Sequence, residues 1–141
     1  MTSAIKADVF TWPVRVYWED TDAGGVVYYA NYLKFLERAR TEWLRALGVE
    51  QVPLKEQYGV LLVISQVEMS YRRPAHYGEV LQVCSFPTEV GKASITLQQQ
   101  VYRHQVGGEL ILDGKVKVAC VDANRFRPKP LPEIIVRSLI A

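Results

Sequence analysis

The chain begins its regular patterning with a segment in which apolar and polar residues alternate. Residues 13–19 read Pro-Val-Arg-Val-Tyr-Trp-Glu and are rich in β-branched and aromatic side chains. Because successive side chains of a strand point to opposite faces, this pattern predicts a half-buried strand. The residues that follow are turn formers and predict a loop: Asp20, Thr21, Asp22, Gly24 and Gly25.

The hydrophobic period changes to that of a helix over residues 31–47. One broad face of this segment is apolar, with Tyr32, Phe35, Leu36, Ala39, Trp43 and Leu47. The other face is charged, and Arg38 and Glu42 stand one turn apart, where they are placed to pair. We expect Asn31 as the N-cap and Gly48 as the C-terminal stop. A helix of about 17 residues is roughly 25 Å long, and its apolar face needs a sheet to cover.

Four alternating runs follow the helix, at residues 63–72, 79–90, 93–106 and 109–122. Glycine-containing turns at 91–92 and 107–108 separate the later runs and predict antiparallel hairpins. Pro74 closes the first run, because proline cannot continue a paired strand. In that run Ile64 faces one side, and the other side carries Val63, Ser65, Val67, Met69 and Tyr71.

The pattern as a whole predicts an α+β fold, with one long helix wrapped by an antiparallel sheet of about five strands. We expect a single domain over residues 1–141. Residues 127–132 form a proline-rich connection, and the structure of residues 134–140 is left open. One face of the third run is polar and is expected to meet solvent or a partner subunit: Ser94, Thr96, Gln98 and Gln100.

Composition and charge exclude several classes of function. The chain has 141 residues and a formal net charge of +2. So small a basic excess argues against a nucleic-acid partner and against a membrane surface. No apolar run approaches the roughly 20 residues of a spanning helix, and the N-terminus lacks the apolar centre of a signal peptide, so we expect the cytoplasm. Cys84 and Cys120 stand in separate apolar runs and are expected to be buried side chains, not a disulfide or metal pair.

Two carboxylates in the predicted loop are the first candidates for chemistry. Asp is common in turns because its side chain caps backbone donors, so Asp20 and Asp22 alone are a weak signal. No His or Cys stands nearby and the calcium-loop spacing is missing, so we expect no metal and no cofactor. Asp22, however, stands a few residues before the predicted helix, whose first N–H groups and dipole can stabilise an oxyanion.

Two stretches of the chain carry a family resemblance: VYWEDTDAGGVVYYANY at residues 16–32 and FLERAR at residues 35–40. They closely resemble the 4-hydroxybenzoyl-CoA thioesterase family, and most closely its Tol-Pal-associated acyl-CoA thioesterase branch. The resemblance extends over nearly the whole chain, from Phe10 to the proline-rich tail. It implies the hotdog fold, in which an antiparallel sheet wraps a long helix, and dimers that join their sheets and often pair into homotetramers.

The resemblance also implies roles for individual residues. The family's catalytic carboxylate is the second Asp of a D-x-D motif, which corresponds to Asp22, and its oxyanion donor is a backbone N–H near Tyr29. Tol-Pal-associated relatives commonly carry His at this position, so a side-chain base is absent from this chain. Position 29 then acts through its N–H, with its phenol close to the acyl group. The expected substrate-binding residues are Gly25, Val26, Tyr28, Ile64 and Lys92.

The implied substrate is an acyl-CoA, whose phosphates require cationic groups at the mouth of the site. The candidates at strand ends or turns are Arg72, Arg73, Lys92, Arg125 and Arg127. Lys92 is the preferred contact, although each of these residues could equally be a solvated surface charge. The acyl pocket is expected among Tyr28, Tyr29, Tyr32, Tyr58, Val63 and Ile64.

The sequence therefore predicts a hydrolase of acyl-CoA or acyl-carrier-protein thioesters, with Asp22 as nucleophile or general base. Two alternatives stay open. A hotdog hydratase or dehydratase would need a paired His and acid in the loop, which has no His. A non-catalytic partner of acyl carrier protein would use the basic residues as contacts. Other nucleophiles are disfavoured, because His76 and His104 stand near no nucleophile motif and no G-x-S-x-G elbow is present.

Overall fold

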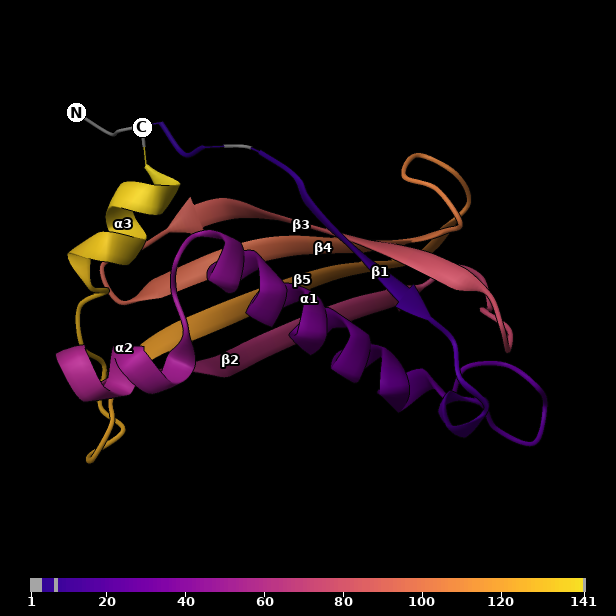
Figure 1. Ribbon diagram of the computed structural model, residues 1–141, viewed down its shortest axis with the longest axis horizontal. Coiled ribbons are helices and arrows are strands. Elements are labelled where there is room, and N and C mark those ends of the chain that lie inside the picture. The colour runs from indigo at the N-terminus through magenta and orange to yellow at the C-terminus, as the bar shows by residue number, and fades with distance from the viewer. Residues whose placement is uncertain (1–3, 7, 141) are drawn as a thin grey trace.

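The structure, a computed structural model, describes residues 4–6 and 8–140. Its strands form one antiparallel sheet in the order β1-β3-β4-β5-β2. Their bounds are β1 Phe10–Arg15, β2 Val60–Tyr71, β3 Val80–Val90, β4 Ser94–Arg103 and β5 Leu110–Asp122. The long helix α1, Tyr32–Ala46, lies across one face of this sheet (Figure 1). The predicted α+β class and the hotdog arrangement are confirmed.

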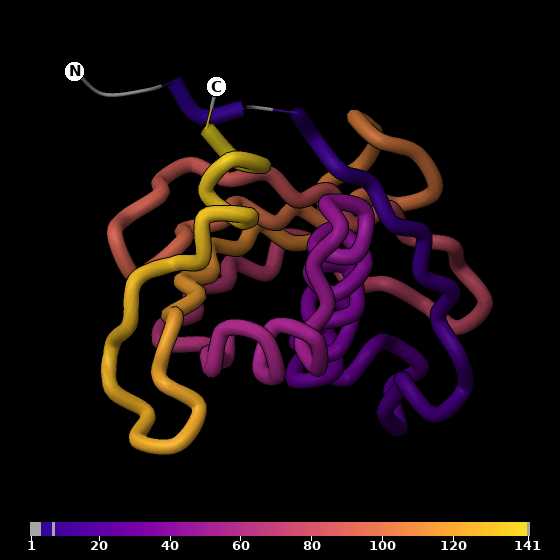
Figure 2. The backbone as a smooth tube through the Cα atoms, turned by 60° about the vertical axis from the view of Figure 1, so that its left-hand side comes forward, coloured from indigo at the N-terminus to yellow at the C-terminus, as the bar shows by residue number. Residues whose placement is uncertain are grey.

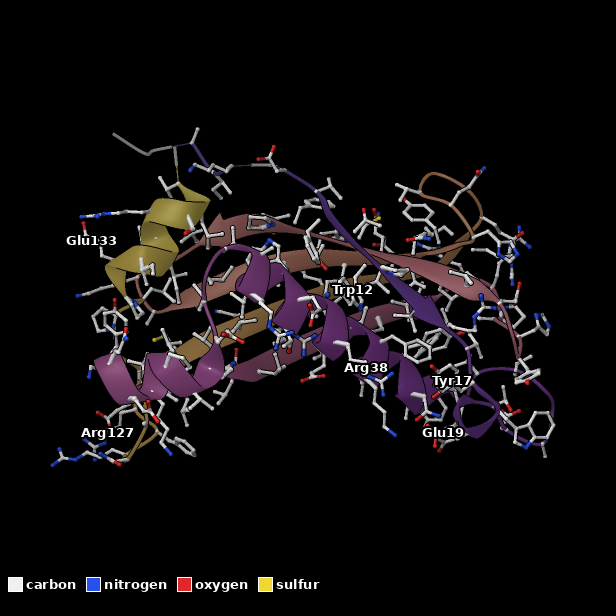
Figure 3. The ribbon with its side chains drawn as sticks, in the orientation of Figure 1. Trp12, Tyr17, Glu19, Arg38, Arg127 and Glu133 are labelled. Atoms are coloured by element: carbon white, nitrogen blue, oxygen red, sulfur yellow. The ribbon has the colours of Figure 1, made fainter. Side chains whose placement is uncertain are left out.

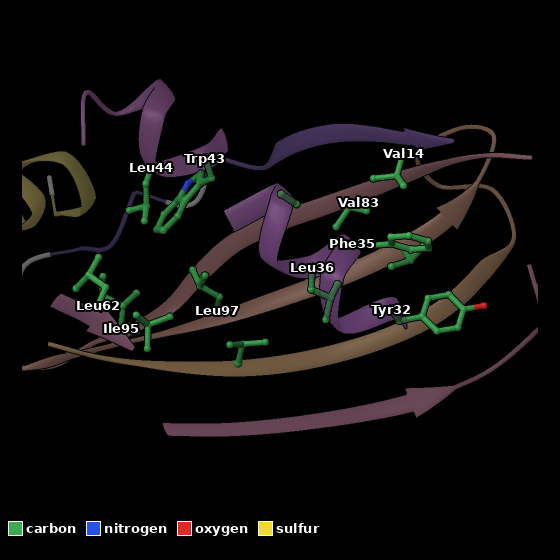
Figure 4. Close-up of a cluster of buried hydrophobic side chains, with 14 of the residues drawn as sticks. Val14, Tyr32, Phe35, Leu36, Trp43, Leu44, Leu62, Val83, Ile95 and Leu97 are labelled. Atoms are coloured by element: carbon green, nitrogen blue, oxygen red, sulfur yellow. The ribbon is translucent and has the colours of Figure 1, made fainter. Parts of the chain in front are cut away.

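The core fills the space between α1 and the sheet (Figure 4). Phe35, Leu36 and Ala39 are fully buried on the inner face of α1, and Leu97 is fully buried opposite them on β4. Each large side chain removed from water in this way stabilises the fold by about 1.5–3 kcal/mol. The apolar helical period of the sequence therefore identified the core face of α1 correctly.

The ends of α1 match the prediction only in part. A short 3-10 turn, η2 (Tyr29–Asn31), precedes the helix. Asn31 does not cap α1 with its side chain, because its backbone is already helical and its amide donates to the carbonyl of Asp20 at 3.0 Å. Gly48 does end the helix, with φ +83° and its N–H donating to Arg45 at 2.9 Å. On the charged face, Glu42 pairs with Arg45 instead of the predicted Arg38.

The first strand lies earlier in the chain than predicted. β1 ends at Arg15, and Trp18–Asp20 form a 3-10 turn, η1, where the alternation suggested a continuing strand. The turn forms because an oxygen of the Asp20 carboxylate accepts the N–H of Tyr17 at 2.8 Å. A local side-chain hydrogen bond thus overrides the strand pattern.

A bulge at Ser65 divides β2 into two halves. Ile64 pairs with Val118 on β5 and Gln66 pairs with Lys117, which leaves Ser65 as an extra residue. Leu62 and Ile64 face α1 before the bulge, and Met69 packs against the core after it. The prediction that Val63 shares a face with Met69 is therefore wrong, because one inserted residue reverses the alternation.

Two further helices complete the fold. The helix α2, Gln51–Tyr58, was not predicted, because it buries only Leu54 and so has no apolar period. The helix α3, Glu133–Leu139, occupies the segment that the pattern left open. The N-terminal segment runs beside α3, where the N–H of Lys6 donates to Leu139 at 2.7 Å (Figures 1 and 2). Among the described residues, no helix is long and apolar enough to cross a membrane.

Both cysteines are buried, as the sequence predicted. Cys84 is 2% exposed on β3 and Cys120 is fully buried on β5, and neither forms a disulfide. Burial raises the pKa of both thiols. These residues therefore act as small apolar side chains in the native protein.

Candidate active site

The loop between β1 and η2 is closed by its own backbone hydrogen bonds. The N–H of Asp22 donates to Val26 at 2.9 Å, and the N–H of Gly25 donates to Asp22 at 3.0 Å. Gly25 has φ +79°, a conformation that favours glycine. A bridge between Thr21 and Val27 fastens the two sides of the loop. The predicted loop thus forms a defined turn at one end of the sheet.

The two carboxylates of the loop have different environments. Asp20 is 6% exposed, and its side chain is bonded to the backbone of Tyr17. Asp22 is exposed, and one of its oxygens accepts the N–H of Gly24 at 2.8 Å. Its other oxygen has no donor within the part of the chain that the structure describes. Asp20 therefore stabilises the loop, whereas Asp22 offers a free oxygen to a ligand.

The start of the helical segment follows directly in the same loop. Tyr29 opens η2, and its N–H has no acceptor among residues 4–6 and 8–140. The carbonyl of Tyr29 accepts the hydroxyl of Tyr71 at 3.1 Å, which ties the turn to the end of β2. Unpaired N–H groups at a helix start form a local positive end that favours anionic groups. The loop thus holds, within one short segment, a carboxylate oxygen without a donor and an N–H without an acceptor among the described residues.

An aromatic groove lies beside Tyr29. It has a volume of about 290 Å³ between the loop and the end of β2, and is lined by Val27, Tyr29, Tyr32, Tyr71, Arg72, Arg73 and Pro74. Burial raises the pKa of the phenols of Tyr32 and Tyr71, so both are neutral hydrogen-bonding groups near pH 7. A hydrogen bond with Tyr29 raises the pKa of Tyr28, whose ring lies 4.9 Å from that of Tyr29.

Tyr71 is the residue of this site that sequence reasoning missed. The alternating pattern places Tyr71 on a strand face and predicts no role for it. Its position at the end of a strand, directly before Arg72 and Arg73, was the feature that could have indicated a binding site. Its ring lies 6.3 Å from the Tyr29 ring and 5.8 Å from the Tyr32 ring, measured between centroids. Tyr71 therefore connects the β2 edge to the loop.

A network of charged side chains around Glu79 holds the segment that pairs with the loop. The segment 74–79 pairs with it, because the N–H of Val27 donates to Ala75 at 2.8 Å and Val26 bridges to His76. Glu79 anchors this segment by accepting the His76 N–H at 2.6 Å and a hydrogen bond from Arg103. His76 and His104 both turn their rings towards Glu79, so the structure gives each a structural contact.

Replacing Glu79 by glutamine should lower the free energy of unfolding by about 1–2 kcal/mol at pH 7, since charged hydrogen bonds are lost. Burial raises the pKa of Glu79, but hydrogen bonds from Arg103 and His76 outweigh it and hold the pKa below its ordinary value. This contribution is therefore complete above the unfolded-state pKa of about 4.3 and disappears as the pH falls through the lower folded-state pKa.

Urea unfolding of wild type and Glu79→Gln, followed from pH 7 down to about pH 3, measures this effect. The gap between the two proteins should shrink as the pH falls. Glu109→Gln is the control, because Glu109 also contacts Arg103 but is 46% exposed at its side chain. A gap that keeps its size down to the lowest pH would exclude the ionised Glu79 as its source.

The predicted site residues divide between the two ends of the sheet. Asp22, Gly25, Val26, Tyr28 and Tyr29 all belong to the one loop. Within one chain, Ile64 and Lys92 lie away from this loop. The hairpin that carries Lys92 joins β3 and β4 at the end away from Val80, about 33 Å along the strand at roughly 3.3 Å per residue. In Figure 3, Arg127 lies at the opposite end of the molecule from Tyr17 and Glu19.

Of the remaining acyl-pocket candidates, only Tyr32 lies near the loop. Tyr58 ends α2, where its carbonyl accepts the ammonium group of Lys129 at 3.1 Å. Val63 points to the outer face of the sheet, as a result of the bulge. Within the described part of the chain, no three His, Cys, Asp or Glu side chains are grouped to hold a metal ion.

Comparison with protein families places this loop in a known context. The model of the thioesterase-like superfamily matches residues 16–139. The chain belongs to this superfamily. The match begins directly after β1 and includes the loop of Asp22, η2 and β2. The family resemblance deduced from residues 16–32 and 35–40 is therefore confirmed.

Individual relatives of this thioesterase-like chain cover nearly all of it. The acyl-CoA thioesterase YbgC of Haemophilus influenzae is 42% identical over 124 residues, which are 88% of this chain and 89% of that protein. The acyl-CoA thioester hydrolase YbgC of Escherichia coli is 39% identical over 132 residues, 94% of this chain and 96% of that protein. The crystal structure of Slr0204, a 1,4-dihydroxy-2-naphthoyl-CoA thioesterase from Synechocystis, has a TM-score of 0.85 at 21% identity, covering 93% of this chain and 95% of that one. That structure supports the fold alone.

Proposed function

We propose that this chain hydrolyses acyl-CoA thioesters to a free acid and a thiol, with Asp22 as the catalytic residue. The observation that carries the proposal is the loop itself, which holds a carboxylate with a free oxygen and an N–H without an acceptor at a helix start. The names of the YbgC relatives support the same activity. No metal or cofactor takes part in the proposed reaction.

In the proposed mechanism, the N–H of Tyr29 donates to the thioester carbonyl oxygen and stabilises the oxyanion as it forms. If Asp22 is the nucleophile, its oxygen bonds to the acyl carbon, the C–S bond breaks, and water then hydrolyses the mixed anhydride. If Asp22 is the general base, it takes a proton from water while the water oxygen attacks, and the thiolate leaves. Both routes require the same free carboxylate oxygen.

The proposed enzyme is a dimer that joins two sheets through β2. This strand is twelve residues long and pairs only with β5, so its outer edge has no partner within residues 4–6 and 8–140. Ile64 and Val67 on this edge are 42% and 36% exposed. Long, unpaired edges with apolar residues favour pairing with another chain. A twofold axis makes the two copies of β2 antiparallel, so each N-terminal half lies beside the partner's C-terminal half.

Such a dimer would unite the site residues that one chain keeps apart. Tyr71, at the C-terminal end of β2, belongs to the loop end of the molecule, whereas Ile64 belongs to its N-terminal half. In the dimer, the Asp22 loop of one copy therefore lies beside the N-terminal half of β2 of the other copy. This half contains Ile64, and the turns that carry basic residues lie at the same end of the sheet. Lys92, with Arg125 and Arg127 at the same end, is then available for the phosphates of coenzyme A or of an acyl carrier protein.

Two finer expectations belong to this proposal. The homotetramer implied by the family resemblance needs a second contact, for which the polar outer face of β4 is available. On this face, Ser94, Gln98 and Gln100 are half-buried, so part of each side chain is accessible to a partner. The expected location remains the cytoplasm.

The test of the proposed function is thiol release from a panel of acyl-CoA and acyl-carrier-protein thioesters, with identification of the product. We expect a free acid and one thiol per turnover. A product that keeps its thioester and gains or loses water would instead indicate a hydratase or dehydratase. Tight binding of acyl carrier protein without hydrolysis of any thioester would indicate a non-catalytic partner.

A further inference from the structure

A second cavity lies between the C-terminal half of α1 and the inner face of the sheet, near the β2 edge. It encloses about 150 Å³. Most of its wall is apolar: Trp43, Leu44, Leu62, Ile64, Ile95 and Leu97, and Figure 4 shows several of these side chains together. A cavity of about this volume holds a benzene-sized, six-carbon ligand. The space therefore fits a short acyl group.

One side chain in this wall is a partly buried arginine. Arg40 lies on α1 and donates from Nη1 to the side-chain oxygen of Gln99 at 3.1 Å. Gln99 is fully buried on β4, and its amide nitrogen donates to the carbonyl of Leu36 at 3.1 Å and to Ser85 at 2.9 Å. Every polar atom of the Gln99 amide is thus engaged, so its oxygen is a fixed acceptor for the guanidinium of Arg40.

Arg40 has no carboxylate partner within 4.0 Å in the described part of the chain. Glu37 on α1 also lines the cavity, but it is exposed and accepts a hydrogen bond from Thr41 at 3.5 Å. Burial lowers the pKa of Arg40, and the Glu37 carboxylate opposes that shift. A guanidinium has five donors in a planar fork that matches a carboxylate, and a partly desolvated one gains most from such a partner.

We propose that this cavity receives the distal end of a short acyl group of about six carbons, and that Arg40 recognises a carboxylate at that end. The inference rests on the proposed thioesterase function and on the β2 dimer. In that dimer the cavity of one copy lies beside the Asp22 loop of the other, so the thioester and the distal end of the acyl group meet different chains. The preferred substrates are then coenzyme A thioesters of short dicarboxylic acids.

The experiment compares two substrates that differ at the distal end alone. Adipoyl-CoA and hexanoyl-CoA both have six acyl carbons, but the first ends in a carboxylate and the second in a methyl group. For the wild-type protein, kcat/KM should be about tenfold or more higher for adipoyl-CoA. Arg40→Gln should lower the ratio of the two values by about 10- to 100-fold, because charge-assisted hydrogen bonds are lost.

Two further variants separate recognition from folding. Arg40→Lys keeps the charge without the planar fork and should give an intermediate ratio. Arg38→Gln, at an exposed arginine of the same helix (Figure 3), should leave both values and their ratio unchanged. Thermal unfolding checks that each variant is folded.

Three outcomes would overturn the inference or its basis. Wild-type protein that prefers hexanoyl-CoA, or does not distinguish the two, excludes a carboxylate site at Arg40 without need of any variant. Equal losses for both substrates in Arg40→Gln would indicate a structural role alone. If neither these nor any other acyl-CoA is hydrolysed, it is the proposed thioesterase function that fails.

Discussion

Asp22→Asn should lower kcat/KM for acyl-CoA by about 10²- to 10⁴-fold, the range that a general acid or base contributes. The amide keeps the size and shape of the side chain, and its oxygen can still accept the N–H of Gly24. What it loses is the negative charge that either attacks the acyl carbon or takes a proton from water. Thiol release under saturating and subsaturating substrate measures the loss.

The matched control for Asp22→Asn is Asp20→Asn in the same loop. The carboxylate of Asp20 accepts the N–H of Tyr17, and an asparagine oxygen can accept the same hydrogen bond. Asp20→Asn should therefore keep most of the activity and lose some thermal stability. Turnover by Asp22→Asn close to the wild-type rate, in a folded protein, would refute the proposed mechanism.

Val67→Lys should convert the proposed dimer to a monomer and lower activity by about tenfold or more. Val67 lies on the free edge of β2, next to the bulge at Ser65, where a twofold axis would bring the two strands together. Lysine on an edge strand opposes pairing, because its charge would have to be buried against the partner strand. Each monomer keeps its own Asp22 loop but loses the second copy's cavity and basic turns.

Light scattering after gel filtration measures the mass, and thiol release measures the activity of the same fractions. Val106→Lys is the control, since Val106 is an exposed valine in the turn between β4 and β5, away from the edge of β2. This control should remain at least dimeric. A fully active monomeric Val67→Lys protein would show that one chain contains the complete site, and a monomeric wild type would exclude the dimer.

The sequence was most informative where one periodic pattern covered many residues. The helical period of α1 identified Phe35, Leu36 and Ala39 as core residues, and the glycine turns gave the order of the last three strands. It failed where a single residue changed the geometry. The bulge at Ser65 cannot be seen in an alternating pattern, yet it places Ile64 in the cavity and turns Val63 away.

The candidate site was predictable only in part. Sequence order put Asp22 and Tyr29 in one loop, but both Asp20 and Asp22 fit a turn equally well by residue type. Their difference depends on hydrogen bonds to Tyr17 and Gly24, which follow from the folded backbone. Gln99 was also hidden, because it stands on the apolar face of a strand whose other face is polar, and its contact with Arg40 joins residues far apart in the chain.

The two buried cysteines make this protein convenient for colorimetric work. The proposed reaction releases a thiol, and thiol-reactive dyes detect the thiolate form. Cys84 and Cys120 are at most 2% exposed, and burial raises the pKa of both, so the native enzyme adds little background to such an assay. In denaturant the same dye would titrate two sulfhydryl groups per chain, so one reagent can report both turnover and the fraction of unfolded protein.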